Sequence, residues 1–244
     1  MNIVRITSII ARIGIGVAII FTLSGCSKFP STPATTGRQL VITLTVRGEV
    51  DVDSLTNLGY SRHYFIAIDN DGDPNTGPLA ALYPPYGGTG WVTSEDAENS
   101  VGLTSFLEYD SENPEGYIYG VEPGSYFLNL TSPDPPITSE ILNDGRSIRF
   151  TIDFSQIATD NIPADSIDEL DINFIATNAL PTGGSEYITG REIDGLGSAG
   201  QDYITISTAT DTTYTDDDTD SSIISDPDLD IVSWQIEVET VSTY

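Results

Sequence analysis

Apolar and polar residues alternate with a period of two along much of the chain after residue 38. In the first such segment the apolar positions are Leu40, Ile42, Leu44 and Val46, and they alternate with Val41, Thr43, Thr45 and Arg47. Alternation of this kind is typical of a β-strand with one buried and one solvated face. Further segments, bounded by Gly, Pro and Asn, have the same pattern or a shorter version of it. The predicted strands are residues 39–50, 64–69, 105–109, 117–121, 126–130, 138–142, 146–154, 170–177 and 231–241.

Helix signals are nearly absent, because no segment keeps a helical period over several turns. We expect at most a short helical turn at residues 155–158 or 164–167. The sequence therefore predicts an all-β fold, a jelly-roll-like β-sandwich of about eight to ten strands with long loops. We assign residues 39–244 to this one domain.

Two segments break the strand pattern and predict long loops. Residues 77–101 contain LYPPYGGTGW, and residues 181–203 are rich in Gly. Loops of this length inside a compact domain often carry function, although tolerated surface insertions look the same in a sequence. Tyr83, Tyr86 and Trp91 gather in the first loop. Aromatic faces of this kind can stack against sugar rings, whereas scattered surface aromatics are the simpler explanation.

The first residues have the layout of an export signal. Arg5 and Arg12 are followed by a charge-free run, residues 13–25, that is too short to span a bilayer. This run ends in Leu23-Ser24-Gly25 and then Cys26, the only cysteine of the chain. We therefore interpret residues 1–25 as a signal peptide. An ordinary secretory signal with a chance cysteine, or an N-terminal anchor helix, remains the alternative.

The LSGC run resembles the lipobox of bacterial lipoproteins. This resemblance implies that the signal is cut before Cys26, that the cysteine carries lipid, and that the protein is held to a membrane of the cell envelope. Residues 26–38, SKFPSTPATTGR after the cysteine, have no apolar period and are interpreted as a flexible tether. Ser27 stands where an aspartate would retain such a protein, so in a diderm host the resemblance points to the outer membrane or cell surface.

The charge of the chain is strongly one-sided. There are 37 Asp and Glu against 9 Lys and Arg, which gives a formal net charge of −28. Such a surface repels nucleic-acid phosphates and anionic lipid headgroups, so we expect no nucleic-acid partner. It attracts cations. The acidic segment 211–230 carries no basic residue, and we interpret it as a solvated, partly disordered loop.

The most specific local pattern is DNDGDPNTG, which follows directly after the apolar strand 64–69. Asp69, Asp71 and Asp73 alternate there, and Asn75 follows at the same spacing. Calcium prefers six to eight oxygen ligands, and alternate carboxylates in a tight loop can curl around one ion. The sequence therefore predicts a calcium site, although not an EF-hand, because Ala80 stands where the closing glutamate would be. An acidic turn without metal is the alternative.

The run YFIAIDNDGDPNTG resembles the strand and loop of β-sandwich domains related to family 9 carbohydrate-binding modules and the glucodextranase C-terminal domain. Those domains often carry Asp-x-Asp-x-Asp-Pro-x-Thr-Gly after an apolar strand, and residues 69–77 match it. The later segments RSIRFTIDFSQI, LDINFIATN and DIVSWQIEVE are similar to the same family. The resemblance implies the sandwich, the metal and, more weakly, sugar binding, because no evident pair of sandwiching tryptophans exists.

Catalysis has little support in the sequence. His63 is the only histidine, and we interpret it as a surface or packing residue; no Gly-x-Ser-x-Gly elbow occurs. The leading interpretation is a membrane-anchored, non-catalytic surface lipoprotein with a calcium-stabilised sandwich that binds glycans. A structural or protein-interaction module of the envelope is the alternative. A glycoside hydrolase built on two carboxylates is a third hypothesis.

Overall fold

The computed structural model describes the residue ranges given at the end of this paragraph, all within one compact unit, Thr32–Tyr244. The predicted signal peptide, Cys26 and nearly all of the tether lie outside the described residues, as do Tyr86 and Trp91. The described residues are 37–50, 61–83, 92–93, 102–110, 113–121, 130–180, 188–217 and 224–241.

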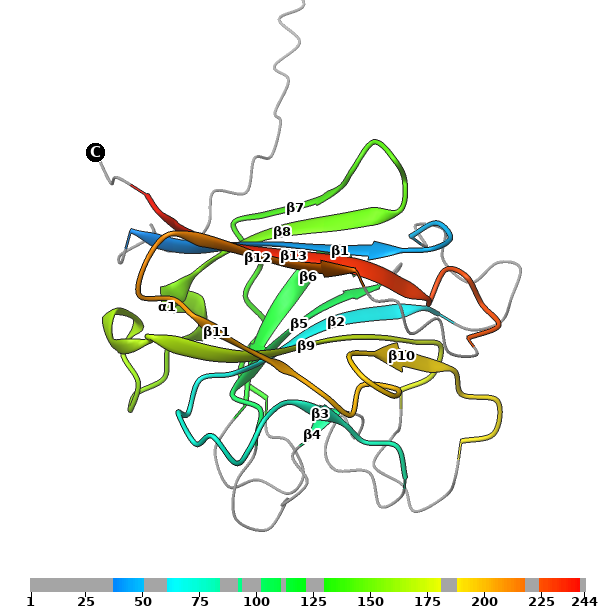
Figure 1. Ribbon diagram of the computed structural model, residues 1–244, viewed down its shortest axis with the longest axis horizontal. Helices are drawn as coiled ribbons and strands as arrows, with labels where there is room; N and C mark the ends of the chain where they lie inside the picture. Colours follow the sequence, from blue (N-terminus) through cyan, green and yellow to red (C-terminus); the bar gives the residue numbers. More distant parts are fainter. Residues whose placement is uncertain are drawn as a thin grey trace, which may run out of the picture. The chain divides into compact units, whose positions relative to one another are not determined.

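Two antiparallel sheets form the layers of the structure (Figure 1). Sheet A contains, in spatial order, β12 (Thr212–Asp217), β13 (Ile231–Thr240), β1 (Arg38–Val46), β8 (Ser147–Asp153) and β7 (Thr138–Ile141). Sheet B contains β10 (Ile193–Gly195), β9 (Glu169–Thr177), β2 (His63–Asp69), β5 (Ser105–Asp110) and β6 (Asn113–Gly120), and β11 (Ile204–Ser207) also pairs with β9. A separate short pair consists of β3 (Leu79–Ala80) and β4 (Val92–Thr93).

The alternation read from the sequence places one face of each sheet in a common core. Leu40, Ile42 and Leu44 of β1 are at most 1% exposed and pack in one apolar cluster with Tyr64 and Ile66 of β2. The prediction of an all-β sandwich is therefore confirmed. In the described residues the two sheets hold five and six strands, more than expected. The strands β10 and β11 are only three and four residues long, and the apolar side chain of β12 is Tyr214 alone, so none of the three shows a clear alternation.

Helical structure in the described residues is confined to two short turns, as the sequence predicted. The turn α1 (Phe154–Ile157) begins at Asp153, whose side chain accepts a hydrogen bond from the Ser155 backbone N–H. A 3₁₀ turn follows at Ala164–Ser166. No helix in the described ranges is long and apolar enough to cross a membrane.

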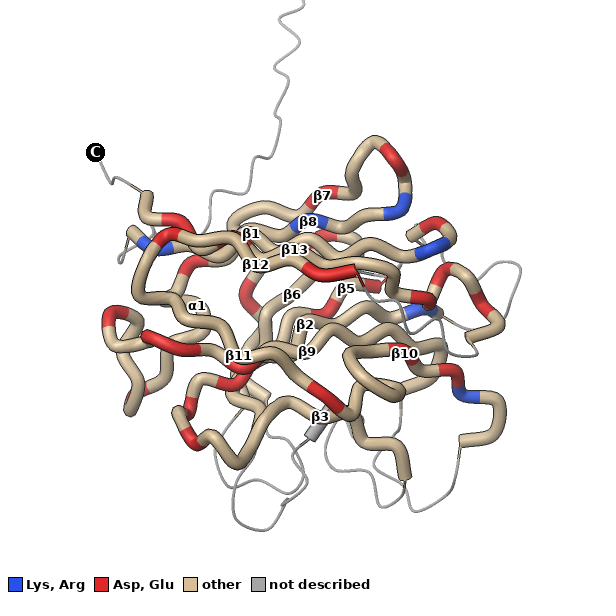
Figure 2. Tube along the Cα trace, viewed as in Figure 1, with Lys and Arg blue, Asp and Glu red and all other residues tan. Residues whose placement is uncertain are grey.

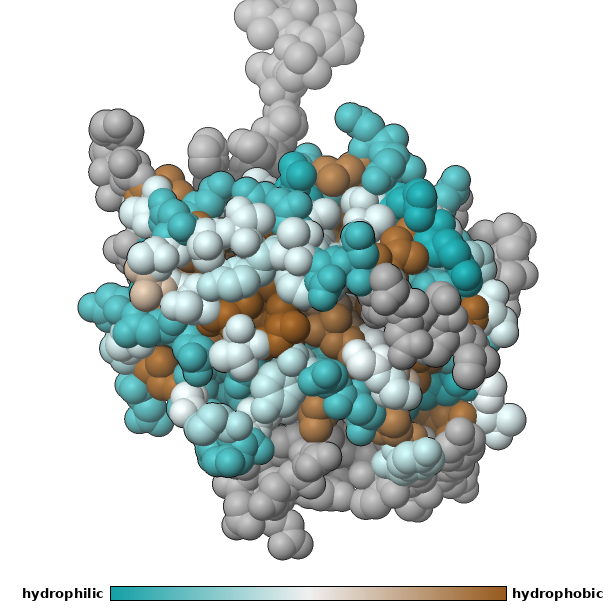
Figure 3. All heavy atoms as spheres, viewed as in Figure 1, coloured by the Kyte–Doolittle hydropathy of each residue, from teal (hydrophilic) through white to brown (hydrophobic). Residues whose placement is uncertain are grey.

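Apolar side chains reach the surface along the line between the two layers. Figure 3 shows these apolar side chains between the edge strands β11 and β12. Ile204 of β11 and Tyr214 of β12 are only partly buried there, and both pack against the core. Sheet B also has an outer face, on the side away from the core. This face carries the candidate functional residues.

A second, smaller apolar cluster lies on that outer face. Phe65 and Ala67 of β2, Phe106 of β5 and Ile175 of β9 pack there with Ala80. We call this side, opposite to the inter-sheet core, the outer face of sheet B. The segment that follows the acidic loop lies over this outer face and is held there by hydrogen bonds. Asn173 Nδ2 donates hydrogen bonds to the carbonyl oxygens of Pro78 and Gly200, at 2.8 and 2.9 Å.

Candidate functional site

Strand β2 carries polar residues at both ends of the outer face of sheet B. Alternation along the strand places His63, Phe65, Ala67 and Asp69 on the same side of the sheet. Phe65 and Ala67, in the middle, belong to the outer apolar cluster. His63 begins the strand and Asp69 ends it, about 20 Å apart at the usual rise of about 3.3 Å per residue. The outer face therefore has two separate polar regions.

At the C-terminal end of β2, the Asp69 side chain is buried, and only one of its two carboxylate oxygens has a hydrogen-bond partner among the described residues. The residue is 2% exposed. Its Oδ1 accepts a hydrogen bond from the Asp71 backbone N–H at 3.1 Å, while its Oδ2 has no hydrogen-bond partner among the described residues. Burial raises the pKa of Asp69 to about 7, and the charges of Asp71 and Asp171 raise it further against the opposing backbone hydrogen bonds. A buried carboxylate in this condition is one that a cation would stabilise.

The loop that follows is shaped by its own side chains. Asp71 Oδ1 accepts from the Asp73 N–H at 2.7 Å, and Asp73 Oδ1 accepts from the Asn75 N–H at 3.0 Å. Each side chain thus binds the backbone two residues later, an Asx turn repeated along the loop. Gly72 has a φ of 75°, which a residue with a Cβ adopts only at a cost. Asn70 fastens the start of the loop through its Nδ2, which donates to the Ile157 carbonyl at 2.7 Å.

Strand pairing brings Asp171 to this region, a residue that the sequence analysis did not select. Asp171 of β9 lies opposite Asp69 in the register of β2 and β9. Its pKa is raised by burial and by the charges of Glu169 and Asp71, although Thr205 Oγ1 donates a hydrogen bond to it. Asp171 is the first polar residue of the predicted strand LDINFIAT. That it faces Asp69 follows only from the register between β2 and β9, which the sequence does not show.

Tyr203 closes the same region from another segment. A Cβ placed on Gly77 would lie 2.2 Å from Cε1 of the Tyr203 ring, so the loop and the ring are in close contact. Burial raises the pKa of Tyr203, and the charges of Asp171, Asp69, Asp202 and Asp73 raise it further. Six acidic or phenolic groups from three segments therefore share one negative region: Asp69, Asp71, Asp73, Asp171, Asp202 and Tyr203.

The three predicted carboxylates of the loop do not all converge. In the described part of the chain, one set of three His, Cys, Asp or Glu side chains has all its ligand atoms within 4.8 Å, and it is His63, Glu108 and Asp110. Asp69 is buried, whereas Asp71, Asp73 and Asn75 are exposed, and Asn75 Nδ2 donates a hydrogen bond to Asp73 Oδ1. The donor set, carboxylates and amide oxygen, fits calcium, and the side chains would have to turn inward to bind it.

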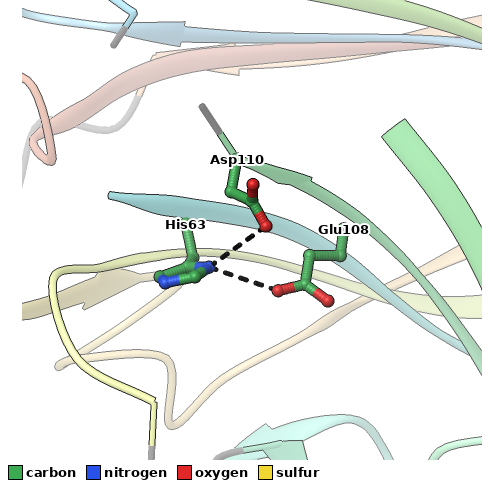
Figure 4. A group of neighbouring side chains, drawn as sticks. All are labelled: His63, Glu108 and Asp110. Atoms are coloured by element: carbon green, nitrogen blue, oxygen red, sulfur yellow. Dashed lines mark hydrogen bonds and ion pairs between the residues drawn. The ribbon is translucent and has the colours of Figure 1, made fainter. Parts of the chain in front are cut away.

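At the N-terminal end of β2, the His63 side chain lies between two carboxylates of the neighbouring strand β5 (Figure 4). Its Nδ1 is 3.2 Å from Oε1 of Glu108 and 3.6 Å from Oδ2 of Asp110. Burial by itself would lower the pKa of His63, but the hydrogen bonds to Asp110 and Glu108 and the charges of both raise it to about 9. The ring also stacks on Phe65, with ring centroids 6.1 Å apart. The interpretation of His63 as only a surface or packing residue misses this cluster.

The predicted aromatic platform is described only in part. Tyr83 is 71% exposed, while Tyr86 and Trp91 lie outside the described residues. Tyr119 of β6 adds an aromatic side chain that the sequence analysis did not select; it stacks on Phe106 with centroids 5.2 Å apart. Burial raises the pKa of its phenol, as do the nearby charges of Glu108 and Asp110.

The interpretation of the second acidic segment as a loop is wrong for residues 212–217, which form the largely exposed strand β12, while residues 224–230 are a loop held by ion pairs. Arg62 Nε is 2.8 Å from Oδ2 of Asp226, and Arg62 Nη2 is 3.2 Å from Oδ2 of Asp228. Arg47 Nη2 is 2.6 Å from Oδ2 of Asp230. Asp226, Asp228 and Asp230 therefore belong to a structural ion-pair cluster.

Comparison of the chain with protein-family models, with curated proteins and with solved structures finds no match in any of the three. The resemblances to bacterial lipoproteins and to family 9 carbohydrate-binding modules therefore remain predictions from the quoted sequence motifs.

Proposed function

We propose that this protein is a non-catalytic binding protein of the cell envelope, anchored by lipid on Cys26. In this proposal calcium stabilises the loop after β2, and the outer face of sheet B binds polysaccharide. The observation that carries the proposal is Asp69, a carboxylate that is 2% exposed and has an oxygen without a partner among the described residues. A bound cation supplies the missing interaction.

The calcium part of the proposal rests on the chemistry of the acidic region. Asp69 and Asp71 are adjacent in the loop, and Asp171 faces them from β9. Asp73 and Asn75 offer further oxygen atoms from the exposed side of the loop. Together these residues would hold the ion, which would neutralise the mutual repulsion of the carboxylates and order the loop. Calcium has no catalytic role in this proposal.

The polysaccharide part rests on aromatic side chains of the same face. Tyr83 exposes 71% of its surface immediately after the segment that covers the outer cluster, and Tyr119 is partly exposed on β6. An exposed aromatic side chain next to polar groups is the usual composition of a ligand-binding surface. Because the acidic loop leads directly into the segment that ends at Tyr83, calcium would stabilise that segment.

The anchor is tested with labelled fatty acid in cells. We expect wild-type protein to incorporate the label and to be found in the membrane fraction. The Cys26→Ala variant should incorporate none and either leave the membrane or stay uncleaved. Incorporation of label by the Cys26→Ala variant would show that the lipid is elsewhere.

Polysaccharide binding is tested with the full chain against a broad panel of soluble polysaccharides. Tyr83→Ala and Trp91→Ala should each weaken binding by about tenfold, a loss of about 1.4 kcal/mol. Val241→Ala, at another exposed apolar side chain, should bind as wild type does. If wild type binds no member of the panel, the polysaccharide assignment is wrong and the envelope interaction module takes its place.

A further inference from the structure

The His63 cluster is built on rigid elements. His63 of β2 pairs with Asp110 of β5, and Phe65 pairs with Glu108, in the antiparallel register of the two strands. The three side chains therefore lie on the same face of the same sheet, on adjacent strands. Their positions are fixed by the backbone hydrogen bonds of the sheet and do not depend on a loop. Sites on strands hold their ligands more precisely than sites on loops.

The distances in the cluster suit coordination of one small ion. Nδ1 of His63 is 3.2 Å from Oε1 of Glu108 and 3.6 Å from Oδ2 of Asp110, and all three ligand atoms lie within 4.8 Å of one another. In a tetrahedral site with metal–ligand bonds of about 2.0–2.2 Å, neighbouring ligand atoms are separated by about 3.4 Å. Both distances from Nδ1 are close to that value, and the two carboxylate oxygens lie within 4.8 Å of each other.

We propose that His63, Glu108 and Asp110 form a site for a divalent transition-metal ion of the zinc type. The site is independent of the proposed calcium loop, which lies at the other end of β2. Imidazole nitrogen is a good ligand for zinc, copper and nickel, whereas calcium prefers oxygen ligands alone. The two ends of one strand therefore differ in the metal that they select.

Charge and access agree with this assignment. Binding of the metal ion displaces the proton from Nδ1 of His63 to solvent, and the neutral imidazole with two carboxylates then carries a charge of about −2, which one divalent ion balances. The side chains of His63, Glu108 and Asp110 are 15%, 17% and 7% exposed. The cluster is thus largely removed from water but still open to an entering ion. Three protein ligands leave a fourth position for water or for a bound ligand.

The chain is well suited to a direct test, because His63 is its only histidine. The full chain is used with Cys26→Ala, which removes the only thiol that would compete for zinc. Zinc is added to protein labelled with ¹⁵N at histidine, and binding is measured in parallel by calorimetry. We expect one zinc ion per chain and a shift of the His63 Nδ1 signal that saturates at the same ratio.

Variants separate the cluster from the acidic surface. His63→Gln should weaken zinc binding by at least about a hundredfold and Asp110→Asn by at least about tenfold, because loss of even an outer-shell partner of a metal ligand costs about 10–100-fold. Glu140→Gln, at an exposed carboxylate that is 3.6 Å from Arg149, is the matched control and should leave zinc affinity unchanged. Asp71→Asn should also leave it unchanged, because Asp71 belongs to the other end of β2.

Two results would overturn the proposal. One is a His63 signal in the Cys26→Ala chain that does not move when zinc binds, a measurement that needs no change in the cluster. The other is equal zinc affinity in the His63→Gln variant, which would assign the zinc to surface carboxylates. In either case the cluster is an ion pair without metal. Neither result bears on calcium or polysaccharide.

Discussion

Two acidic segments of this chain have the same spacing and opposite surroundings. Aspartates alternate at residues 69, 71 and 73, and again at residues 226, 228 and 230. Figure 2 shows basic residues beside the second segment, next to β13, and none along the loop after β2. The spacing of the acids therefore does not decide what they bind.

The second segment is neutralised from within the chain. Arg62, 8% exposed as a whole residue, contacts both Asp226 and Asp228, and Arg47 contacts Asp230. The segment also binds backbone groups: Asp228 Oδ1 accepts from the Glu49 N–H at 2.9 Å. These contacts hold the end of the segment against β1 and β2. Its acids have no need of an external cation.

The first segment has no such neutralisation. Among the ion pairs of the described residues, none involves Asp69, Asp71 or Asp73. Asp171 adds a fourth carboxylate, and the pKa of Asp69 rises to about 7. In a chain with 9 basic and 37 acidic residues, cationic side chains are scarce. The comparison teaches that this loop, unlike the second segment, has no internal cation among the described residues, and for this reason we propose a cation from solvent as its partner.

The largest expected effect comes from removing the cation of the neutralised segment. Arg62→Met leaves Asp226 and Asp228 without their guanidinium and should lower the free energy of unfolding by about 3–5 kcal/mol. Urea denaturation measures it. The matched control is Arg149→Met, because Arg149 and Glu140 are 40% and 56% exposed; it should cost about 1 kcal/mol or less. Equal losses in the two variants would show that Arg62 does not neutralise a buried cluster.

The next largest effect concerns Asp69, in the acidic region without an internal cation. The effect of its replacement on stability should be favourable without calcium and unfavourable with calcium. At pH 8 without calcium, Asp69→Asn should stabilise the fold, because it removes a buried charge. Calcium at tenfold its dissociation constant should stabilise wild type by about 1.4 kcal/mol and the variant much less. Thermal melts in EDTA, calcium and magnesium at matched ionic strength measure both effects. Magnesium should do less, since it loses its water reluctantly.

Asp228→Asn is the control for this reversal. It weakens a pair with Arg62 and should destabilise the fold by the same amount with and without calcium. If Asp69→Asn behaves in the same way as Asp228→Asn, the acidic loop does not bind calcium. If Asp71→Asn gains as much from calcium as wild type does, the gain is general screening by a divalent ion.

The pH dependence without calcium follows from the same carboxylate. The pKa of Asp69 is about 7 in the folded chain against an ordinary value of 3.8. Folding therefore takes up a proton between these pH values, and the contribution of Asp69 to stability falls as the pH rises from about 4 to about 7. Saturating calcium should remove this fall. Melting temperatures across that range, with and without calcium, measure it against Asp69→Asn.

The smallest effect comes from His63, whose positive charge is lost when the imidazole is deprotonated. Its pKa of about 9 exceeds the ordinary 6.5, so its attraction to Glu108 and Asp110 is fully present below pH 6.5 and is lost as the pH rises to about 9. We expect the free energy of unfolding to fall over this range as the charge of His63 is lost. His63→Gln in metal-free buffer should lack this step. A step of the same size in the variant would assign it to another group.

The sequence by itself determined the class of fold and the position of its acidic loop. Alternation at Leu40, Ile42 and Leu44 specifies a strand with one buried face, and a period of two needs only local information. The two short helical turns at residues 154–157 and 164–166 were predicted within one or two residues. The acidic loop was found because its nine residues are consecutive.

Tertiary structure alone decided which charges meet. Asp171 faces Asp69 because β9 pairs with β2 in one particular register, and a shift of one residue would turn it to the other face. His63 meets Glu108 from 45 positions away, and Arg62 meets Asp226 from 164 positions away. Periodicity shows which face a side chain occupies but not which strand lies beside it. For that reason two segments with the same Asp-x-Asp-x-Asp spacing were distinguished only after the sheets were in place.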